Sequence, residues 1–526
     1  MKNFDLEIKK LAEIYTITDP FYLSDFFQDE GSKKLYEFLK SIYCSEYSND
    51  FRIVIVQDCV DQYMYQDLPG QALTALQKYL SQIDISNFFV TVITSNPQVE
   101  RELEQVRELY STDQCCMNYV QVKDTDYEII FEPKDTFCVL PWMHLYTGPD
   151  GNILPCCTAD RQFPMGNIHQ QSIDSILKSH QFNQIRSNML LGLRSKECAR
   201  CYQQEDSGLP SSRKMHNSRW ALSKLTLATD GTIDEFNPKY LDIRLNNICN
   251  LKCRMCSGYF SSSIAQEETK LFGNSEFIDG AINRRQRDLL LDEILKYLPS
   301  AEKIYFAGGE PLLMPEHYRI LNALIDCGNT SLEIVYSSNF SVLTYKTVSV
   351  TELWKQFSNV TVMTSLDAIG PVAEYVRHGT NWRQIESNLI TVKMQCPHVD
   401  IKVSSTVSLL TVSSLIDLQK HWHQQGMLNI TKFFLSILSG PEHLSICALP
   451  LHHKTRLTNL ISQHIEWCKQ QNANTQANEW TSVISHMHSR DLSYLIPEFQ
   501  RLTMQMDQYR GESLAAVLPE LSDLMG

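Results

Sequence analysis

The sequence predicts an α/β protein built around a parallel sheet, and three patterns support this prediction. Between residues 238 and 445, short apolar segments rich in β-branched residues alternate with longer amphipathic segments. This alternation is typical of βα units, and six units in succession predict an open or closed barrel. A shorter strand–helix–strand–helix pattern lies within residues 1–125. After residue 446 the apolar residues follow the helical period, except in the polar run 470–480, which is expected to be a loop.

The composition excludes several classes of protein. The chain has 526 residues, of which 43% are hydrophobic and 21% charged, a mix typical of globular rather than disordered proteins. Its net charge of −14 predicts no nucleic-acid partner and no membrane partner. No apolar run approaches the roughly 18 residues that span a bilayer, and the first residues lack the apolar segment of a secretory signal. We therefore expect a cytoplasmic protein, whose 16 cysteines are metal ligands, catalytic thiols or packing residues rather than disulfides.

These patterns divide the chain into five expected parts. Residues 1–125 are expected to form an α/β domain of unknown role, with partner or substrate recognition as one possibility. Residues 130–205 hold a first group of cysteines, and residues 206–237 form a transition segment. The barrel region covers residues 238–445, and residues 446–526 form a helical C-terminal region.

Three cysteines closely follow the first predicted strand of the barrel region. Cys249, Cys253 and Cys256, called here the cysteine triplet, have the spacing CxxxCxxC just after the segment YLDIRLN. Three thiolates can bind three irons of a 4Fe–4S cube, which leaves the fourth iron open to the amine and carboxylate of a small molecule. Structural zinc usually has four ligands, and no other Cys or His occurs within the next fifty residues. The spacing favours an iron–sulfur cluster, with zinc as the alternative.

A second motif, FAGGEPLL, ends the next predicted strand at Phe306–Leu313. Its glycines let backbone approach a ligand closely, and its carboxylate can pair with an ammonium group. CxxxCxxC and GGEP, one βα unit apart, resemble the radical SAM superfamily. The resemblance implies a partial (β/α)6 barrel with a 4Fe–4S cluster on the cysteine triplet. It also implies that Gly308, Gly309 and Glu310 bind the methionyl amine of S-adenosylmethionine (SAM).

A third stretch, TSLDAIGPVAEYVRHGTNW, follows the fourth predicted strand and resembles the SxD…RxG segment of peptide-modifying members. By position, the resemblance implies that Ser365 and Asp367 lie at the SAM ribose and that Arg377 meets the SAM carboxylate. The plain alternative is a capped βα loop with a surface arginine. Asn339 ends the third strand, where relatives carry a polar residue that faces SAM or substrate. Two features depart from the family pattern: Met255 replaces the usual aromatic residue, and GxIxGxxE is absent from the fifth strand, so adenine contacts from that strand are not assigned.

Residues 130–205 hold a second group of four cysteines, called here the auxiliary set, in the order C-x12-G-x4-C…CxxC: Cys138, Cys156, Cys198 and Cys201. The turn signal PDGN between two strand-like runs predicts a hairpin, with Cys138 and Cys156 across it. The order resembles the twitch and SPASM domains of radical SAM enzymes and implies one auxiliary 4Fe–4S cluster with no open iron, as in the shorter twitch form. Here this domain precedes the barrel, whereas in most relatives it follows. Four thiolates would also suit a zinc ribbon, and Cys157 could replace Cys156.

The resemblance implies a radical SAM enzyme, an iron–sulfur oxidoreductase of the peptide-maturase type. Such an enzyme cleaves SAM reductively to a 5′-deoxyadenosyl radical, which abstracts hydrogen from its substrate. The expected substrate is a peptide or protein that is modified after translation, and the expected electron donor is a flavodoxin or ferredoxin. The alternative is a small-molecule radical SAM dehydrogenase, and the remote alternative is a zinc-stapled binding protein without activity. The sequence identifies no catalytic acid or base.

Overall fold

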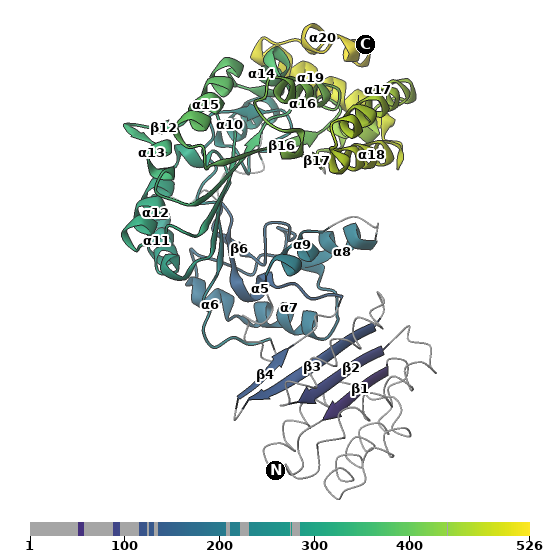
Figure 1. Cartoon of the computed structure of the whole chain (residues 1–526). Helices are drawn as coiled ribbons and strands as arrows, with labels where there is room; N and C mark the ends of the chain where they lie inside the picture. The colour runs from purple at the N-terminus through teal and green to yellow at the C-terminus, as the bar shows by residue number, and fades with distance from the viewer. Residues whose placement is uncertain are drawn as a thin grey trace, which may run out of the picture. The chain divides into compact units, whose positions relative to one another are not determined.

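The computed structural model describes residues 51–56, 88–94, 115–123, 126–130, 135–206, 211–220, 231–273, 275, 284–438 and 440–526, drawn in colour in Figure 1. The first four of these segments are strands whose backbone alone is described. The helices expected at residues 71–83 and after residue 97 lie outside the described residues.

The chain divides into two compact units. The first comprises Met1–Trp142 and Lys178–Glu235, and the second comprises Met143–Leu177 and Phe236–Gly526. The five-part division expected from the sequence stays a prediction.

In the first unit, four strands form one sheet in the order β1-β2-β3-β4. They are β1 (Phe51–Val56), β2 (Phe88–Thr94), β3 (Cys115–Lys123) and β4 (Asp126–Ile130). The first three are parallel and β4 is antiparallel to β3. β1 and β2 lie where the β-branched runs predict strands, whereas β3 and β4 were not predicted.

The remainder of the first unit is helical. Its helices are α7 (His180–Leu190), α8 (Ala199–Asp206) and α9 (Ser212–Arg219), and the short α5 (Leu140–Met143) begins in it. Buried side chains tie these helices to the segment around Cys138. Nη1 of Arg213 donates to Phe137 O at 2.7 Å, and the Tyr202 hydroxyl donates to Thr136 O at 3.1 Å. The chain segment that carries Cys138 is thereby fixed against α8 and α9.

The second unit contains a nine-stranded sheet in the order β17-β16-β14-β11-β10-β8-β5-β6-β7. Six parallel strands of this sheet are joined through helical segments in chain order: β8 (Tyr240–Ile243), β10 (Lys303–Phe306), β11 (Glu333–Ser338), β14 (Asn359–Ser365), β16 (Asp400–Val407) and β17 (Phe433–Ile437). Each lies in a segment whose apolar, β-branched pattern predicts a strand. The prediction of a parallel α/β sheet is therefore confirmed.

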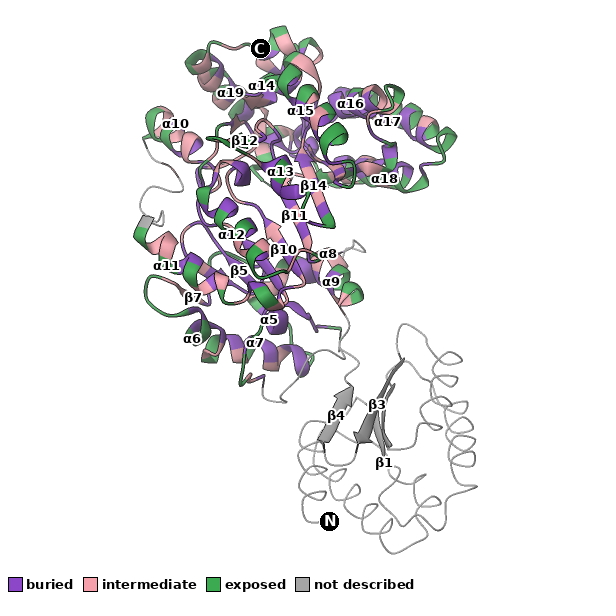
Figure 2. Cartoon of the chain, turned by 60° about the vertical axis from the view of Figure 1, so that its left-hand side comes forward, coloured by how far each residue is buried: buried purple, intermediate pink, exposed green. Residues whose placement is uncertain are grey.

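Helices connect these strands and cover one face of the sheet (Figures 1 and 2). They are α10 (Ser262–Phe272), α11 (Arg284–Leu295), α12 (Pro315–Asp326), α13 (Val350–Trp354), α14 (Gly370–Val376), α15 (Trp382–Gln395) and α16 (Ser414–Gln424). Alternate residues of β11, β14 and β16 are buried, and those between them are mostly half-exposed. On the covered face, the Tyr336 hydroxyl bonds His317 Nε2 of α12 at 2.8 Å and accepts from Trp354 Nε1 of α13 at 3.2 Å. The opposite face is left with polar, half-exposed side chains.

The hairpin predicted at PDGN is confirmed, with β5 (His144–Thr147) antiparallel to β6 (Asn152–Leu154). Gly151 has a φ of 78° in its turn, which glycine adopts without strain. The element to which the hairpin is joined could not be predicted from local sequence patterns. β5 pairs in parallel with β8, so β5, β6 and β7 (Gly166–Asn167) extend the main sheet beyond its first parallel strand.

The C-terminal region is helical, as expected, with α17 (Leu451–Gln470), α18 (Asn474–His488), α19 (Ile496–Arg510), α20 (Leu514–Val517) and the 3-10 turn η10 (Pro519–Met525). The loop expected at residues 470–480 is confirmed only for residues 471–473, because α18 begins at Asn474. Ala477, Trp480 and Val483 recur at helical spacing and are buried, and this apolar face outweighs the polar composition of the run.

The second unit also contains short elements: α6 (Ile173–Leu177), β9 (Lys252–Cys253), β12 (Thr344–Tyr345), β13 (Val348–Ser349) and β15 (Arg377–His378). β9 pairs with β15 and β12 with β13. Within the described part of the chain, no helix is long and apolar enough to cross a membrane.

Candidate functional site

The predicted site segments follow the carboxyl ends of four neighbouring parallel strands. The cysteine triplet follows β8, the GGEP motif follows β10, Asn339 follows β11, and the SxD segment closes β14. Carboxyl ends of parallel strands meet at one edge of a sheet, which is where α/β proteins place their functional loops. The sheet therefore brings these segments, up to 130 residues apart in the sequence, to a common edge.

The cysteine triplet lies in the loop between β8 and α10, and all three residues are partly exposed. The N–H of Leu251 points to Cys249 Sγ at 3.4 Å, and Cys256 N donates to Cys253 O at 3.1 Å in a tight turn. The loop ends in a cap, where Ser261 Oγ accepts from Ile264 N at the start of α10 and donates to Leu251 O at 3.1 Å. Local hydrogen bonds therefore shape the loop that carries the three thiols.

Burial raises the pKa of the Cys249 and Cys256 thiols to about 12 and also raises that of Cys253. The thiols influence one another, because the charge of Cys253 raises the pKa of Cys249, and both raise that of Cys256. Three thiolates cannot share this loop without a cation to offset their repulsion. An iron or zinc ion supplies that charge and lowers the thiol pKa on binding.

The number of thiols, rather than a measured spacing, bears on the choice between the two metals. Structural zinc usually has four ligands, whereas the triplet supplies three. Among the described residues, three metal-ligating atoms lie within 4.8 Å of one another in the group His452, His453 and Asp523.

Gly308 and Gly309 pack against the backbone that leads into the triplet. A Cβ atom on Gly309 would stand 2.0 Å from Ile248 O, and one on Gly308 would stand 3.0 Å from Asn246 O. Gly308 also has a φ of 115°. The chain's own backbone therefore favours glycine at both positions, and their predicted contact with a ligand stays a prediction.

Glu310 is fully buried and accepts three hydrogen bonds from the chain itself. Its donors are Asn339 N at 2.7 Å, Ser338 Oγ at 2.8 Å and Leu312 N at 3.1 Å. Burial raises the pKa of Glu310 to about 7, although these hydrogen bonds act in the opposite direction. The carboxylate thus ties the end of β10 to the end of β11.

Asp367 and Arg377 form a buried ion pair beside the triplet. Arg377 Nε donates to Asp367 Oδ2 at 2.7 Å, and Asp367 Oδ1 accepts from Thr406 N at 2.7 Å. Burial alone would lower the pKa of Arg377, but Asp367 and the Cys253 thiol raise it above its usual value. Arg377 Nη1 also lies 3.6 Å from Cys253 Sγ. Ser365 is partly exposed at the end of β14 and does not join this pair.

Asn339 contacts the cysteine loop directly. Its Nδ2 donates to Asn250 Oδ1 at 2.9 Å and lies 3.8 Å from Cys249 Sγ. This contact lowers the pKa of Cys249, against the larger effect of burial. Asn339, which the sequence analysis singled out by resemblance alone, is therefore adjacent to the thiol of Cys249.

The sequence analysis missed a polar group on the open face of the sheet. Tyr146, Asp242 and Tyr305 are register partners on β5, β8 and β10, so they share a face. Arg244 Nε donates to Asp242 Oδ1 at 3.0 Å, and its guanidinium lies 5.0 Å from the Tyr146 ring centre. Asp242 and Arg244 alternate with Ile243 along the chain, and this pattern predicts that both polar side chains lie on one face of the sheet. The residues that they contact on neighbouring strands depend on the strand order, which the pattern does not predict.

The auxiliary set falls in both units. Cys138, Cys198 and Cys201 belong to the first unit, and Cys156 belongs to the second. Burial raises the pKa of Cys138 to about 12, and the charge of Cys201 raises it further, so these two thiols are neighbours. In the second unit, Cys156 is buried and its Sγ lies 3.1 Å from Thr158 Oγ1, whereas Cys157 is exposed and its thiol is hydrogen-bonded to Asp242.

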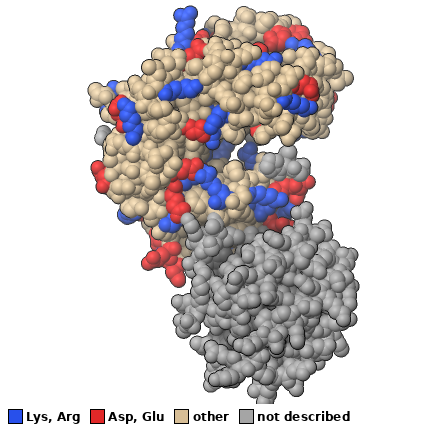
Figure 3. Space-filling view, in the orientation of Figure 1, with Lys and Arg blue, Asp and Glu red and all other residues tan. Residues whose placement is uncertain are grey.

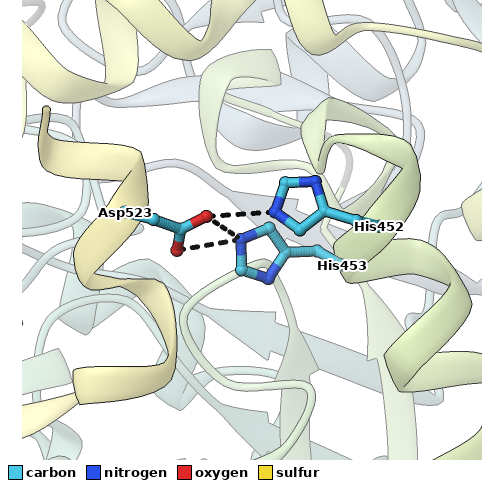
Figure 4. A group of neighbouring side chains, drawn as sticks. All are labelled: His452, His453 and Asp523. Atoms are coloured by element: carbon cyan, nitrogen blue, oxygen red, sulfur yellow. Dashed lines mark hydrogen bonds and ion pairs between the residues drawn. The ribbon is translucent and has the colours of Figure 1, made fainter.

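Figure 4 shows the group of metal-ligating side chains at the start of α17. His452 Nε2 and His453 Nε2 each lie 3.0 Å from Asp523 Oδ2. Burial would raise the pKa of Asp523, but the hydrogen bonds from both histidines lower it. The positive end of a helix dipole favours a carboxylate over a metal cation. We interpret this group as an anchor that holds η10, the last turn of the chain, to α17.

Charged side chains are mixed in sign on the face shown in Figure 3, where lysines and arginines lie among aspartates and glutamates. The described residues on this face therefore present no continuous basic surface of the kind that nucleic acid binds.

Comparison with known proteins identifies two domains. Residues 243–408 match the family model of the Radical SAM superfamily, and residues 138–202 match SPASM, an iron–sulfur cluster-binding domain. The cysteine triplet falls inside the first match and all four members of the auxiliary set fall inside the second. No curated protein sequence matches the chain.

Several solved structures are similar to part of the chain. Native anSMEcpe with bound AdoMet is 16% identical, with a TM-score of 0.33 over 45% of this chain and 62% of that one. The same protein with AdoMet and the Cp18Cys peptide is 15% identical, with a TM-score of 0.31 over 45% and 61%. Streptococcus suis SuiB bound to S-adenosylmethionine is 13% identical, with a TM-score of 0.29 over 56% and 63%. The chain spans about three fifths of the length of these proteins.

The two family models agree with the resemblance that the cysteine motifs and GGEP implied. The chain contains a SPASM iron–sulfur cluster-binding domain at residues 138–202, which precedes a Radical SAM domain at residues 243–408.

Proposed function

We propose that the cysteine triplet binds a 4Fe–4S cluster and that the enzyme uses it to modify a peptide or protein after translation. When bound, the cluster would supply the electron that cleaves SAM to methionine and a 5′-deoxyadenosyl radical, which abstracts hydrogen from the substrate. The observation that carries the proposal is the triplet itself: three neighbouring thiols, one fewer than structural zinc usually takes, at the functional edge of a parallel sheet.

The residues around the triplet have distinct roles in this proposal. Gly308 and Gly309 let the GGEP segment pack on the cysteine loop, so that the open iron and the SAM amine would share one small region. Arg377 offers positive charge beside Cys253 for the SAM carboxylate, and Asp367 orients that guanidinium. Ser365 is on the open face of β14, where a hydroxyl can contact ribose. Glu310 acts by holding the ends of β10 and β11 together, with the SAM amine as a further partner.

The substrate class is inferred from the open face of the sheet. Half-exposed polar side chains line successive strands there, including Ser337 on β11 and Ser404 on β16, and the apolar Phe434 on β17 is also exposed. A broad surface of mixed polarity suits a chain-like substrate better than a small molecule enclosed in a pocket. We propose a flavodoxin or ferredoxin as electron donor, and substrate recognition as the role of residues 1–125.

For the auxiliary set we propose a second 4Fe–4S cluster, supported by the match to an iron–sulfur domain and by the spacing of Cys138, Cys156, Cys198 and Cys201. Four thiolates would leave no iron open, so this cluster would transfer electrons and not bind substrate.

The test is an iron count after anaerobic reconstitution, in the wild type and in a variant with alanine at all three triplet positions. About eight irons per chain falling to about four supports two 4Fe–4S sites. The reduced wild type should also convert SAM to 5′-deoxyadenosine, and the variant should not. Equal iron in both proteins, or no 5′-deoxyadenosine from an iron-loaded wild type, would overturn the proposal. Peptide modification is then distinguished from a small-molecule reaction by the mass change of candidate peptides.

A further inference from the structure

The C-terminal end of the chain contacts the cysteine loop directly. Arg254, between Cys253 and Cys256, donates from Nη2 to Asp507 Oδ1 at 2.5 Å and to Glu512 Oε2 at 2.6 Å. Asp507 is in the last turn of α19 and Glu512 follows Gly511, which ends that helix in a left-handed conformation. Figures 1 and 2 both show α19 beside α14, the helix that leads into β15.

Arg254 is surrounded by partners that a buried guanidinium requires. Its side chain is 2% exposed, its Nε donates to Tyr375 O at 3.2 Å, and its guanidinium lies 3.7 Å from the Tyr375 ring centre. The Tyr375 hydroxyl in turn donates to Asp507 Oδ1 at 2.9 Å. A buried cation is stable only with its counter-charges in place, so the position of Arg254 depends on Asp507 and Glu512.

Further polar contacts join the same segment to the small sheet of β9 and β15. Arg510 pairs with Glu267 of α10 at 2.5 Å, with both side chains at most 3% exposed, and Glu267 lies 3.4 Å from Lys252 Nζ of β9. His378 Nδ1 of β15 lies 2.6 Å from Glu512 Oε1. The segment 507–512 therefore contacts β15 directly and reaches β9, which contains Cys253, through Glu267.

We propose that residues 507–512 position the cysteine loop for cluster binding, so that the C-terminal region is part of the cluster site. Arg254 is covalently between two ligands, and its backbone N–H donates to Val376 O at 2.9 Å. It cannot shift without moving Cys253 and Cys256, and metal ligation tolerates displacements of only a few tenths of an ångström. Asp507 and Glu512 each also contribute a negative charge beside the cluster. This inference rests on the proposed role of the triplet.

The test combines Asp507→Asn and Glu512→Gln, which remove charge while keeping the shape of each side chain. Residues that orient metal ligands typically contribute 10–100-fold to metal affinity. We expect chelator to remove iron at least about 10-fold faster than from the wild type. The cluster that remains should have a more positive reduction potential, because lost negative charge favours the added electron. If the double variant fails to fold, Glu512→Gln alone is the milder change, since Glu512 is the more exposed partner.

Glu442→Gln is the matched control, because Glu442 pairs with Arg490 on the surface of the same C-terminal region. The rate of iron loss to chelator and the reduction potential of the cluster should be the same in this control as in the wild type. In the background with alanine at all three triplet positions, the double substitution should cause no further iron loss. The proposal would be overturned if a folded double variant lost iron to chelator at the wild-type rate and kept the wild-type reduction potential. It would also be overturned if Glu442→Gln lost iron as fast as the double variant. A wild type that binds no iron at the triplet would instead overturn the proposed function.

Discussion

Gly309 and Ile248 approach so closely that a Cβ atom on Gly309 would stand 2.0 Å from the Ile248 carbonyl oxygen. The N–H of Glu310 donates to that same oxygen at 2.7 Å. The GGEP segment is thus packed, backbone to backbone, on the residue that precedes Cys249. The contact links the two motifs mechanically, in addition to any ligand that they share.

Gly309→Ala is expected to lower the free energy of unfolding by about 3 kcal/mol or more and to reduce iron at the cysteine triplet. The clash is with backbone, so no side-chain rotation relieves it. Gly328→Ala is the control, because Gly328 has a φ of 76° but open space around its Cβ position. That change should cost only about 1 kcal/mol and leave the iron content unaltered. Urea unfolding and iron analysis of both variants measure the difference, and equal effects would contradict the packing argument.

Glu310 should make stability depend on pH in the apoprotein. Its folded pKa is about 7, above the usual value of 4.5, because burial favours the neutral form. The folded state therefore binds more protons between these values, and the stabilisation present below pH 4.5 is lost as the pH rises through 7. The change amounts to at most about 3 kcal/mol, at 1.36 kcal/mol per pKa unit.

Glu310→Gln should remove this slope, since an amide does not titrate in the range. Urea midpoints of the wild type and the variant at pH 5, 6, 7 and 8 measure it. At pH 8 the variant is still expected to be less stable in absolute terms, because its NH2 group must face a donor among Asn339 N, Ser338 Oγ and Leu312 N. Parallel pH profiles for the two proteins would show that Glu310 keeps an ordinary pKa.

Local patterns in the sequence were sufficient for the six parallel strands from β8 to β17 and for the loops that carry the site, but not for β3 and β4. Runs such as those of β10 and β14 are apolar and β-branched, and a βα series puts the segments after such strands at one edge of the sheet. The triplet and GGEP could therefore be placed without coordinates. The polar run that begins α18 was predicted as a loop from its composition alone. The helical spacing of Ala477, Trp480 and Val483 would have predicted a helix there.

The partners of the site could not be predicted, because they depend on contacts between distant segments. Arg254 meets Asp507 and Glu512 across 253 and 258 residues, and nothing local in the helical C-terminal region marks those two carboxylates. Glu310 illustrates a second limit. Its motif predicted a ligand contact, whereas three hydrogen bonds to the chain became visible only when β10 and β11 were adjacent.

Asp367→Asn should destabilise the second unit by about 3–5 kcal/mol, because it leaves the guanidinium of Arg377 buried without its counter-charge. The new amide can keep the hydrogen bond from Thr406 N only by turning its NH2 group toward Arg377. Asp288→Asn is the control: Asp288 and Arg319 are both about half exposed, so that change should cost at most about 1 kcal/mol. Adding Arg377→Gln to Asp367→Asn should cost less than the sum of the single changes in urea unfolding. Strict additivity would mean that the two side chains do not interact.

Cys156 and Cys157 should differ sharply in iron binding although they are adjacent. Cys156 is buried beside Thr158, whereas Cys157 is exposed and its thiol is engaged with Asp242 on β8. A cluster ligand must leave its hydrogen-bond partner, and the Cys156–Thr158 contact is local and weak compared with a bond to a carboxylate. Cys156→Ser is therefore expected to lower iron from about eight to about four per chain, and Cys157→Ser to leave it near eight. The reverse pattern would assign the ligand to Cys157, and loss of iron in both variants would show that the turn they share, not either thiol, is what the auxiliary site requires.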